Sequence, residues 1–230
     1  MNDALVQIKN ISKIYKDQKI IVFKNLNYKF FPGKTYSIVG PSGSGKSSLL
    51  NILSLIDKPS SGKIIIKKKE VNFTNNIEND ILRAKKIGII YQDSCLLQDF
   101  TAVENIQLAR LTINQDENSA RKEAYQMLKN VGLKNRANHY PSELSGGEAQ
   151  RVSICRALIN SPDVILADEP TGSLDHINSK EIFKILFKLK KKNRTIIFAT
   201  HNMYFAKMAD FKLQIINGKI NSYNARIRNT

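Results

Sequence analysis

The chain has 230 residues, of which 42% are hydrophobic and 24% charged, a balance typical of a globular protein with a sizeable core. No apolar run in the sequence reaches the roughly 18 to 20 residues that cross a bilayer. Residues 1–7 contain no basic segment followed by an apolar one. We therefore expect neither a membrane span nor a signal peptide. Cys95 and Cys155 lie far apart without metal-ligand spacing, which favours two free thiols.

The formal net charge is +16, and such a field attracts nucleic acids, anionic membrane surfaces and nucleotides. Specific base recognition relies on arginine, whereas lysine dominates here and the basic residues are scattered along the chain. The charge therefore favours a lysine-rich surface facing acidic lipid headgroups, and we expect no specific nucleic-acid partner. A general compositional bias toward lysine, asparagine and isoleucine is the alternative explanation.

The first thirty residues predict a small antiparallel β region. Residues 5–8 and 20–30 alternate apolar and polar side chains, as strands with one buried face do. Pro32 and Gly33 then form a turn. Tyr15, between the two segments, is placed either to stack on a nucleotide base or to fill core or surface space.

A glycine-rich loop follows, between a predicted strand at residues 34–39 and a predicted helix at residues 48–55. Its residues are Gly40, Pro41, Ser42, Gly43, Ser44, Gly45, Lys46 and Ser47. This pattern, in this setting, is that of a phosphate-binding loop. The glycines let backbone N–H groups point at an anion, and the helix N-terminus adds its own unpaired N–H groups. Lys46 supplies a charge for the outer phosphates, and the Ser47 hydroxyl can ligate Mg²⁺.

The remaining elements surround a helical insertion. We expect strands at residues 63–66, 87–91, 164–167 and 195–200, helices at residues 80–86 and 178–192, and a polar connection at residues 67–79. Residues 93–138 turn helical, and Thr101 with Glu104 predicts a capping box. A final hairpin over residues 211–216 and 219–220, with a type I′ turn at Asn217 and Gly218, precedes a tail at residues 221–230 that we expect to be basic and loose.

Polar side chains stand at the predicted carboxyl ends of the parallel strands, where α/β proteins bind ligands. They are Gln92, Asp168, Glu169 and His201. Asp168 is placed to hold Mg²⁺ opposite Ser47, Glu169 to polarise an attacking water, and His201 to contact the outer phosphate or that water. An acidic pair opening a helix is the alternative for Asp168 and Glu169, although Pro170 argues against an immediate helix.

A second helix start carries the residues Leu144, Ser145, Gly146, Gly147, Glu148, Ala149 and Gln150. Ser145 and Glu148 predict a capping box, which is a purely structural interpretation. A cap does not need two glycines, however, and glycines let the backbone approach something closely while the helix N-terminus favours an anion. The chain then has two anion-binding helix starts, whereas one nucleotide offers one triphosphate.

These motifs, in this order, resemble those of ATP-binding cassette ATPases, the nucleotide-hydrolysing subunits of ABC transporters, over residues 5–220. The matching positions are Tyr15 as the adenine-stacking aromatic, residues 40–48 as Walker A with Ser48 as its last residue, Gln92 as the Q-loop, residues 144–150 as the signature, residues 164–169 as Walker B, Asp175 in the D-loop, and His201 as the switch histidine. The signature makes this resemblance far more specific than a phosphate loop alone.

The resemblance implies an α/β fold: a P-loop NTPase core with a mostly parallel sheet and flanking helices, an antiparallel β subdomain and an inserted α-helical subdomain. Residues 1–220 would form one ATPase domain, with the core and β subdomain in residues 1–92 and 160–220 and the signature-bearing helical subdomain in residues 93–159. The implied reaction is hydrolysis of ATP with Mg²⁺, held by Ser47, Gln92 and Asp168. Glu169, His201 and Gln92 would be the catalytic residues.

The resemblance also explains the second helix start. Two subunits would pack head to tail on binding ATP, forming a homodimer or a pair of different cassettes. Each ATP would lie between Walker A of one subunit and the signature of the other, formed by Leu144, Ser145, Gly146, Gly147, Glu148 and Gln150. Two departures, Ala149 where a polar residue is frequent and Asn202 where Asp is usual, touch no residue with a chemical role. We therefore expect an active ATPase.

A further resemblance is to the LolD-type subunit of the lipoprotein-releasing system and, in part, to MacB-like exporters and FtsE. It is carried by residues 45–53, 91–92, 96–97, 100–105, 136–143 and 166–172. This implies a peripheral protein at the cytoplasmic face of the inner membrane, with a LolC- and LolE-like pair of integral partners. Residues 95–105 would receive those partners, although Leu96, Leu97 and Phe100 are alternatively core residues. Three competing interpretations stay open: a small-solute importer, a soluble cassette ATPase acting on nucleic acid or ribosomes, and a P-loop kinase or GTPase.

Overall fold

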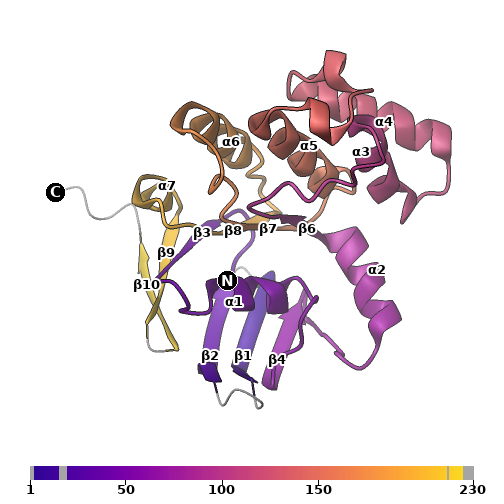
Figure 1. Ribbon diagram of the computed structural model, residues 1–230. Coiled ribbons are helices and arrows are strands. Elements are labelled where there is room, and N and C mark those ends of the chain that lie inside the picture. The colour runs from indigo at the N-terminus through magenta and orange to yellow at the C-terminus, as the bar shows by residue number, and fades with distance from the viewer. Residues whose placement is uncertain (1–2, 16–19, 217, 225–230) are drawn as a thin grey trace. The chain divides into compact units, whose positions relative to one another are not determined.

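Residues 3–15, 20–216 and 218–224 are described by the computed structural model. They divide into two units (Figure 1). The first unit comprises the described residues up to Asp80, then residues 166–168, then those from Lys190 onward. The second unit comprises residues 81–165 and 169–189. It therefore contains the expected helical insertion, residues 93–159, and extends beyond it on both sides.

A four-stranded antiparallel sheet in the order β2-β1-β4-β5 opens the first unit. Its strands are β1 (Val6–Tyr15), β2 (Ile20–Phe30), β4 (Ser61–Ile66) and β5 (Lys69–Glu70). Val6 pairs with Phe30 on one side and with Ile66 on the other. Ile8, Phe23, Leu26 and Phe30 are buried, whereas Ile20 and Ile21 at the start of β2 are exposed. The predicted β region is thus confirmed, and β5 lies in a stretch that we expected to be irregular.

The second sheet of this unit centres on β3 (Thr35–Val39), which lies parallel to both β8 (Thr195–Ala199) and β9 (Phe211–Ile216). Beyond β8 lies β7 (Val164–Asp168), and beyond β9 lies β10 (Lys219–Asn224). Every residue of β3 and β8 is buried, which explains the apolar run of residues 196–199 in β8. Helix α1 (Lys46–Leu53) follows β3, and the unpredicted short helix α7 (Met203–Lys207) follows β8.

Two expectations about where elements end were wrong. The hairpin strand β10 continues to Asn224, antiparallel to β9, so residues 221–224 are not a loose tail. The expected turn residue Asn217 and the tail residues 225–230 lie outside the described residues. Helix α6 (His176–Lys188) ends before Lys190, whose ammonium instead forms an ion pair with Asp210.

The second unit is mainly helical. Its helices are the C-terminal part of α2 (Asn76–Lys86), then α3 (Ala102–Leu111), α4 (Glu117–Asn130), the short η1 (Lys134–Arg136) and η2 (Pro141–Glu143), α5 (Gly146–Leu158) and α6. Strand β6 (Ile87–Ile90) lies beside β7. Helices α3, α4 and α5 pack together (Figure 1) around buried apolar side chains such as Val103, Ala124, Leu128 and Val152. Within the described residues, no helix is long and apolar enough to cross a bilayer.

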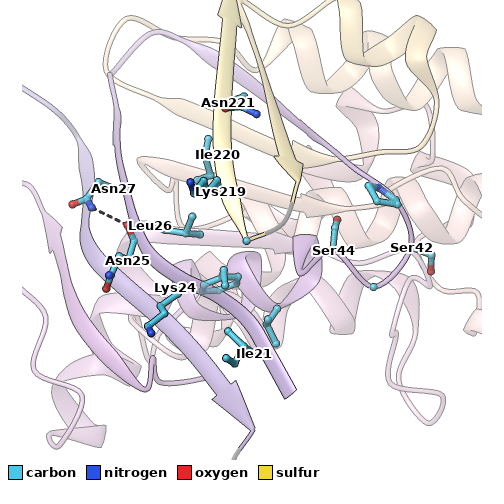
Figure 2. A pocket seen from close by; sticks show the side chains of 15 residues that line it. Ile21, Lys24, Asn25, Leu26, Asn27, Ser42, Ser44, Lys219, Ile220 and Asn221 are labelled. Carbon is cyan, nitrogen blue, oxygen red and sulfur yellow. Dashed lines mark hydrogen bonds between the residues drawn. The ribbon is translucent and has the colours of Figure 1, made fainter. Parts of the chain in front are cut away.

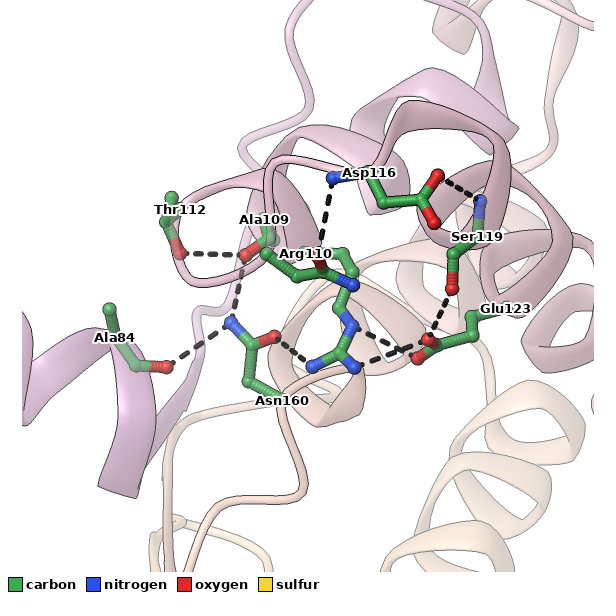
Figure 3. A network of polar contacts seen from close by, with 9 residues as sticks. Ala84, Ala109, Arg110, Thr112, Asp116, Ser119, Glu123 and Asn160 are labelled. Carbon is green, nitrogen blue, oxygen red and sulfur yellow. Dashed lines mark hydrogen bonds and ion pairs between the residues drawn. The ribbon is translucent and has the colours of Figure 1, made fainter.

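A polar network holds α3, α4 and the end of α5 (Figure 3). The Arg110 guanidinium contacts the carboxylate of Glu123, with Nε 3.0 Å from Oε2. The amide of Asn160 donates to the carbonyl oxygens of Ala84 and Ala109, at 3.2 and 2.8 Å. These side chains satisfy carbonyls at helix ends that no helical bond reaches, and so the network fixes the end of α3.

The buried carboxylate of Asp210 joins three parts of the first unit. It accepts hydrogen bonds from the Thr35 backbone N–H at 2.8 Å and hydroxyl at 3.0 Å, and from Lys190 Nζ at 2.7 Å. Burial raises the pKa of Asp210, but the hydrogen bonds from Lys190 and Thr35 outweigh it and hold the pKa below its ordinary value. The carboxylate thereby secures the start of β3, the strand that leads into the phosphate loop.

We expect Asp210→Asn to lower the free energy of unfolding by about 2 kcal/mol at neutral pH, because it removes charge-assisted hydrogen bonds. The depressed pKa means that the ionised carboxylate stabilises the fold above the unfolded-state pKa, near 3.8. The difference between the two proteins should therefore shrink as pH falls through the still lower folded-state pKa. Urea unfolding across that pH range measures it.

Asp3→Asn is the matched control, because Asp3 pairs with Lys68 and both side chains are at least 70% exposed. It should change stability by less than about 0.5 kcal/mol. A difference between Asp210→Asn and the wild type that is unaltered by pH would contradict the assigned role of the charge.

Candidate functional site

The phosphate loop follows β3 and enters α1 through a residue in the left-handed conformation. Gly45, at the N-cap of α1, has φ 93° and makes no side-chain cap hydrogen bond. A Cβ there would lie 2.5 Å from Val22 Cγ1, and a Cβ at Gly40 would lie 2.6 Å from Ser44 Oγ and 2.7 Å from the Ile215 carbonyl oxygen. The loop is therefore a backbone cradle whose close turns require glycine.

Lys46 is folded over this cradle. Its ammonium donates to the carbonyl oxygens of Gly40 and Pro41, both at 3.0 Å, and the residue is only 7% exposed. An ammonium has three N–H donors, so the two carbonyl contacts hold the charge at the loop and use two of them. Ser47 lies exposed in the first turn of α1.

Other predicted site residues of the first unit lie at neighbouring strand ends. The Thr200 N–H donates to the Ile38 carbonyl oxygen at 3.1 Å, so His201 follows β8 as the phosphate loop follows β3. Asp168 ends β7, the next strand in that sheet. Asn202 caps α7 by accepting from the Tyr204 N–H, a task that Asn performs as well as Asp.

Two side-chain atoms show that this unit fits Mg²⁺ and phosphate. The Oγ of Ser44 and the Oδ1 of Asp168 are buried and have no hydrogen-bond partner among the described residues. Buried oxygen atoms of this kind are costly unless a ligand or an ion engages them. Carboxylate and hydroxyl oxygens are also the donors that Mg²⁺ prefers.

A pocket of about 800 Å³ adjoins the phosphate loop (Figure 2). It is lined by β2, Gly218 and the start of β10, and Pro41 to Ser44 of the loop. Lys24, Lys219 and the amide of Asn27 stand around apolar Leu26 and Ile220. Because open space rather than packed core borders the loop here, its residues can adjust to a ligand.

In the second unit, the predicted capping box is present. The Ser145 hydroxyl accepts from the Glu148 N–H at 3.3 Å, and the Glu148 carboxylate accepts from the Ser145 N–H at 2.8 Å. The Arg136 guanidinium also contacts that carboxylate, at 3.0 Å. The pKa of Glu148 lies below its ordinary value, chiefly because its carboxylate accepts the hydrogen bond from the Ser145 backbone N–H. Partial burial opposes this effect, and hydrogen bonds with the Ser145 hydroxyl and Arg136 lower the pKa further. Ser145 itself stays exposed at the head of α5.

The two glycines after Ser145 are packed against the same chain. A Cβ at Gly147 would collide with Oδ1 of Asn178, and one at Gly146 would lie 3.3 Å from Leu174 Cδ2. Asp175, which lies between Leu174 and Asn178 in the sequence, caps α6 by accepting hydrogen bonds from the backbone N–H groups of Ile177 and Asn178. These backbone hydrogen bonds lower the pKa of Asp175. The signature glycines thus bring the starts of α5 and α6 together.

Gln92 lies in a segment without helix or strand. Side chains of α5 donate hydrogen bonds to backbone carbonyls before and after Gln92 in this segment. Buried Gln150 donates to the Tyr91 carbonyl oxygen at 2.8 Å. Arg156 donates to the carbonyl oxygens of Ser94 and Cys95 at 2.8 and 2.7 Å. Gly172 and the Ser173 hydroxyl lie against Gln92. Gln150 is therefore part of the interior, unlike exposed Ser145.

Further along that segment, the apolar residues divide between core and surface. Leu96 is 6% exposed and lies in the helical core, whereas Leu97 and Phe100 are 49% and 38% exposed. Buried Asn105 donates to the carbonyl oxygens of both exposed residues, at 3.0 and 2.9 Å, and accepts from the Leu97 N–H. The predicted interaction of Thr101 with Glu104 is present, and the Glu104 carboxylate accepts from both the hydroxyl and the backbone N–H.

Glu169 adopts a conformation that is unusual for its residue type. Its φ is 46°, in the left-handed region, although it precedes Pro170. Such strain costs on the order of 1–3 kcal/mol and clusters at functional sites. The Glu169 carbonyl accepts from the Gly172 N–H at 2.9 Å, which closes a turn after β7.

Sequence reasoning missed the roles of Lys13, Asn105, Arg156 and Asn178. Lys13, Arg156 and Asn178 contact segments distant in the chain, and no local spacing signals such contacts. Asn105 acts nearer by, on backbone groups of an irregular segment whose conformation the sequence pattern does not predict. The one available clue was a lysine among apolar residues, next to Ile14.

Comparison with known proteins identifies relatives over nearly the whole length. A family model described as ABC transporter matches residues 23–172. The lipoprotein-releasing system ATP-binding protein LolD of Wigglesworthia glossinidia brevipalpis is 46% identical over 226 residues, covering 97% of this chain and 99% of that protein. An uncharacterized ABC transporter ATP-binding protein of Methanocaldococcus jannaschii is 42% identical, covering 94% and 97%.

The fold has a close match among solved structures. The dimeric structure of a post-hydrolysis state of the ATP-binding cassette MJ0796, bound to ADP and Pi, superposes with a TM-score of 0.89 at 36% identity. The match covers 96% of this chain and 99% of that one. The expected cassette fold, with its antiparallel β and helical subdomains, is confirmed.

The packing of α5 against α6 gives a test. We expect Gly147→Ala to lower the free energy of unfolding by roughly 1–3 kcal/mol, because its new methyl group overpacks the contact with Asn178. Gly146→Ala is the matched control, since its methyl group meets a flexible leucine and alanine favours a helix by up to about 1 kcal/mol. Urea unfolding compares them.

Adding Asn178→Ala to Gly147→Ala should restore much of the lost stability, because it removes the colliding atom. If Gly147→Ala is as stable as Gly146→Ala, the close approach does not constrain this position.

Proposed function

This chain belongs to the ABC transporter family as an ATP-binding subunit that couples ATP hydrolysis to transport, and from that premise we propose that its transporter releases lipoproteins from the inner membrane toward the outer membrane. The 46% identity to LolD over almost the full length of both chains carries this proposal. A relative without an assigned cargo is 42% identical, so identity in this range does not by itself fix the cargo. A MacB- or FtsE-like complex and a small-solute importer are the competing functions, and co-purification of membrane partners distinguishes them.

ATP would bind first through the first unit. The backbone N–H groups of the phosphate loop and of the α1 N-terminus surround the phosphates, and the third N–H donor of Lys46 reaches the outer ones. Tyr15 stacks on the adenine. The uncapped N-terminus of α1 supports this assignment, because it keeps those N–H groups for a ligand.

The residues that would hold Mg²⁺ are Ser47, Asp168 and Gln92. Mg²⁺, when bound, neutralises charge on the outer phosphates and orients them for in-line attack. The buried, unpartnered Oδ1 of Asp168 supports its part in this.

Hydrolysis would depend on Glu169 and His201. Glu169 orients an attacking water and takes its proton, and His201 donates a hydrogen bond to the outer phosphate. The strained backbone of Glu169 supports a functional role, since the fold maintains a conformation that an ordinary turn residue would avoid.

A second copy would complete each site. The exposed N-terminus of α5, with Ser145 and Gly146, would donate to the phosphates of an ATP bound to the other copy. The relative MJ0796 is described as dimeric with ADP and Pi bound, and this supports the pairing. Asp175 caps the adjacent helix α6 and so keeps the neighbouring loop in place.

Leu97 and Phe100 would form the surface that meets the integral membrane partners, at the cytoplasmic face of the membrane. They are exposed apolar side chains on a segment whose backbone Asn105 holds firmly. Exposed apolar groups on a fixed backbone are typical of interaction sites.

We expect Glu169→Gln to bind ATP and dimerise while hydrolysing it roughly 100-fold or more slowly, because the amide cannot accept the proton of the attacking water. Steady-state turnover and sedimentation with ATP measure the two effects. Glu117→Gln, an exposed residue in the first turn of α4, is the control and should behave as wild type. Near-normal turnover by Glu169→Gln would refute the assignment.

The cargo class is tested by trapping the tagged Glu169→Gln protein with ATP in detergent-solubilised membranes of its host and identifying what co-purifies. A pair of membrane proteins with large periplasmic domains supports lipoprotein release. A permease with a solute-binding protein makes the chain part of an importer. Ribosomes or DNA without a membrane protein would overturn the transporter assignment.

We expect Leu97→Asp combined with Phe100→Asp to abolish that co-purification, because a charged surface cannot bury an apolar partner. ATP affinity should change less than about two-fold, since the substituted side chains point to solvent. The control is Ile77→Asp on α2, which charges another apolar side chain that is 75% exposed. Partners that still co-purify with the double variant would place the docking surface elsewhere.

A further inference from the structure

Lys13 is a buried lysine in β1, next to two other buried residues, Ile11 and Ser12. It is 8% exposed, although lysine is almost never buried unless it is paired. It lies two residues before Tyr15 on β1, so the two side chains project from the same face of the strand. Lys13 is not part of any of the family motifs described above.

Two contacts explain where the ammonium lies. Its Nζ is 2.6 Å from Oδ2 and 2.8 Å from Oδ1 of Asp57, and 3.2 Å from the Lys58 carbonyl oxygen. The Asp57 N–H in turn donates to the carbonyl oxygen of Asn51 in α1. Lys13 therefore connects β1 to the end of the helix that begins at the phosphate loop.

The same ammonium covers one face of the Tyr15 ring. Nζ lies 4.8 Å from the ring centroid, within the range of a cation–π interaction. Tyr15 is 41% exposed, so part of the ring stays open to a ligand. A side chain at the end of a strand has free rotamers to lose, and the cation restricts them before any ligand arrives.

We propose that Lys13 is a positioning residue, which fixes the Tyr15 ring as the platform for the nucleotide base and, through Asp57, fixes that platform relative to the phosphate loop. The inference rests on the proposed stacking role of Tyr15, and it extends that role to a residue outside the nucleotide contacts. A ring that is already ordered binds a base without a further ordering cost. Lys13 should therefore matter to ligands that carry a base and not to bare phosphates.

Equilibrium binding of ADP and of inorganic pyrophosphate, each with Mg²⁺, tests this without turnover. Lys13→Met keeps most of the aliphatic stem and removes the charge. We expect it to weaken ADP binding about 3- to 20-fold, the range of a partly desolvated cation–π contact, while pyrophosphate affinity stays within about two-fold. In ATP hydrolysis, KM should rise and kcat should be unchanged.

A double-mutant cycle supplies the decisive comparison. In a Tyr15→Ala background, Lys13→Met should have no further effect on ADP binding. Lys9→Met, an exposed lysine on the same strand, is the control and should change neither affinity. Lys13→Arg, which restores a cation over the ring, should recover most of the ADP affinity.

Asp57→Asn provides a second route if Lys13→Met folds poorly. Asp57 is 31% exposed and its substitution weakens the anchor without emptying the interior. It should give the same selective loss of ADP affinity, to a smaller extent. Equal losses for ADP and pyrophosphate would overturn the proposal, because Lys13 would then support the fold or the loop.

The outcome is independent of the proposed cargo. If Tyr15→Ala leaves ADP affinity unchanged, the stacking role and the role of Lys13 both fail, whatever the transporter moves. If Tyr15→Ala weakens ADP and Lys13→Met does not, the ring needs no positioning by the cation and the proposal alone fails.

Discussion

Binding a triphosphate requires backbone N–H groups that are not already hydrogen-bonded within the protein. The first unit provides such groups at the phosphate loop and the start of α1. Helix α1 begins at a left-handed glycine without a side-chain cap, so its first N–H groups are not satisfied locally. Gly40 and Gly45 are packed so closely by Ser44, Ile215 and Val22 that a side chain at either would move the loop. Such a loop cannot stabilise itself. Its position depends on β3, which is buried throughout and paired on both sides.

The position of β3 in turn depends on the carboxylate of Asp210. It binds the N–H and hydroxyl of Thr35, the first residue of β3, and it is itself held by Lys190. The strand that delivers the loop is thus anchored at its start by a buried charge and along its length by parallel neighbours. A buried ion pair contributes little net stability against apolar groups of the same shape, but it specifies one register strongly.

In the second unit, polar side chains likewise hold an irregular backbone segment in place. The segment from Gln92 to Thr101 has no strand or helix to satisfy its backbone carbonyls, and an unpaired buried carbonyl is costly. Three side chains from neighbouring helices do so instead: Gln150, Arg156 and Asn105. Because Gln150 and Arg156 belong to the helix that Ser145 opens, hydrogen bonds join this segment directly to the signature helix.

The sequence predicts local features well and long-range ones poorly, for physical reasons. The strand, loop and helix around Lys46, and the capping boxes at Thr101 and Ser145, follow from spacing within a few residues. The end of α6 and the length of β10 were wrong because tertiary partners decided them: Lys190 pairs with Asp210, and the polar residues 221–224 gain a complete ladder from β9. The two signature glycines were interpreted as room for a ligand. Part of that room is filled by Leu174 and Asn178 of the same chain, a contact that no periodicity reveals.

The two departures from the family pattern show where this chain is free to vary. Ala149 packs against the helical core, and Asn202 caps α7 as an aspartate would. Both substitutions preserve a structural role and leave the phosphate loop, Asp168 and Glu169 unaltered. Leu97 and Phe100, by contrast, are exposed on a backbone that Asn105 holds through hydrogen bonds, and they leave these chemical residues untouched. Under the proposed function, the phosphate chemistry and the docking surface use different residues. Identity across the chemical motifs therefore supports the reaction, and the proposal about what is moved is tested at the exposed apolar residues of the second unit.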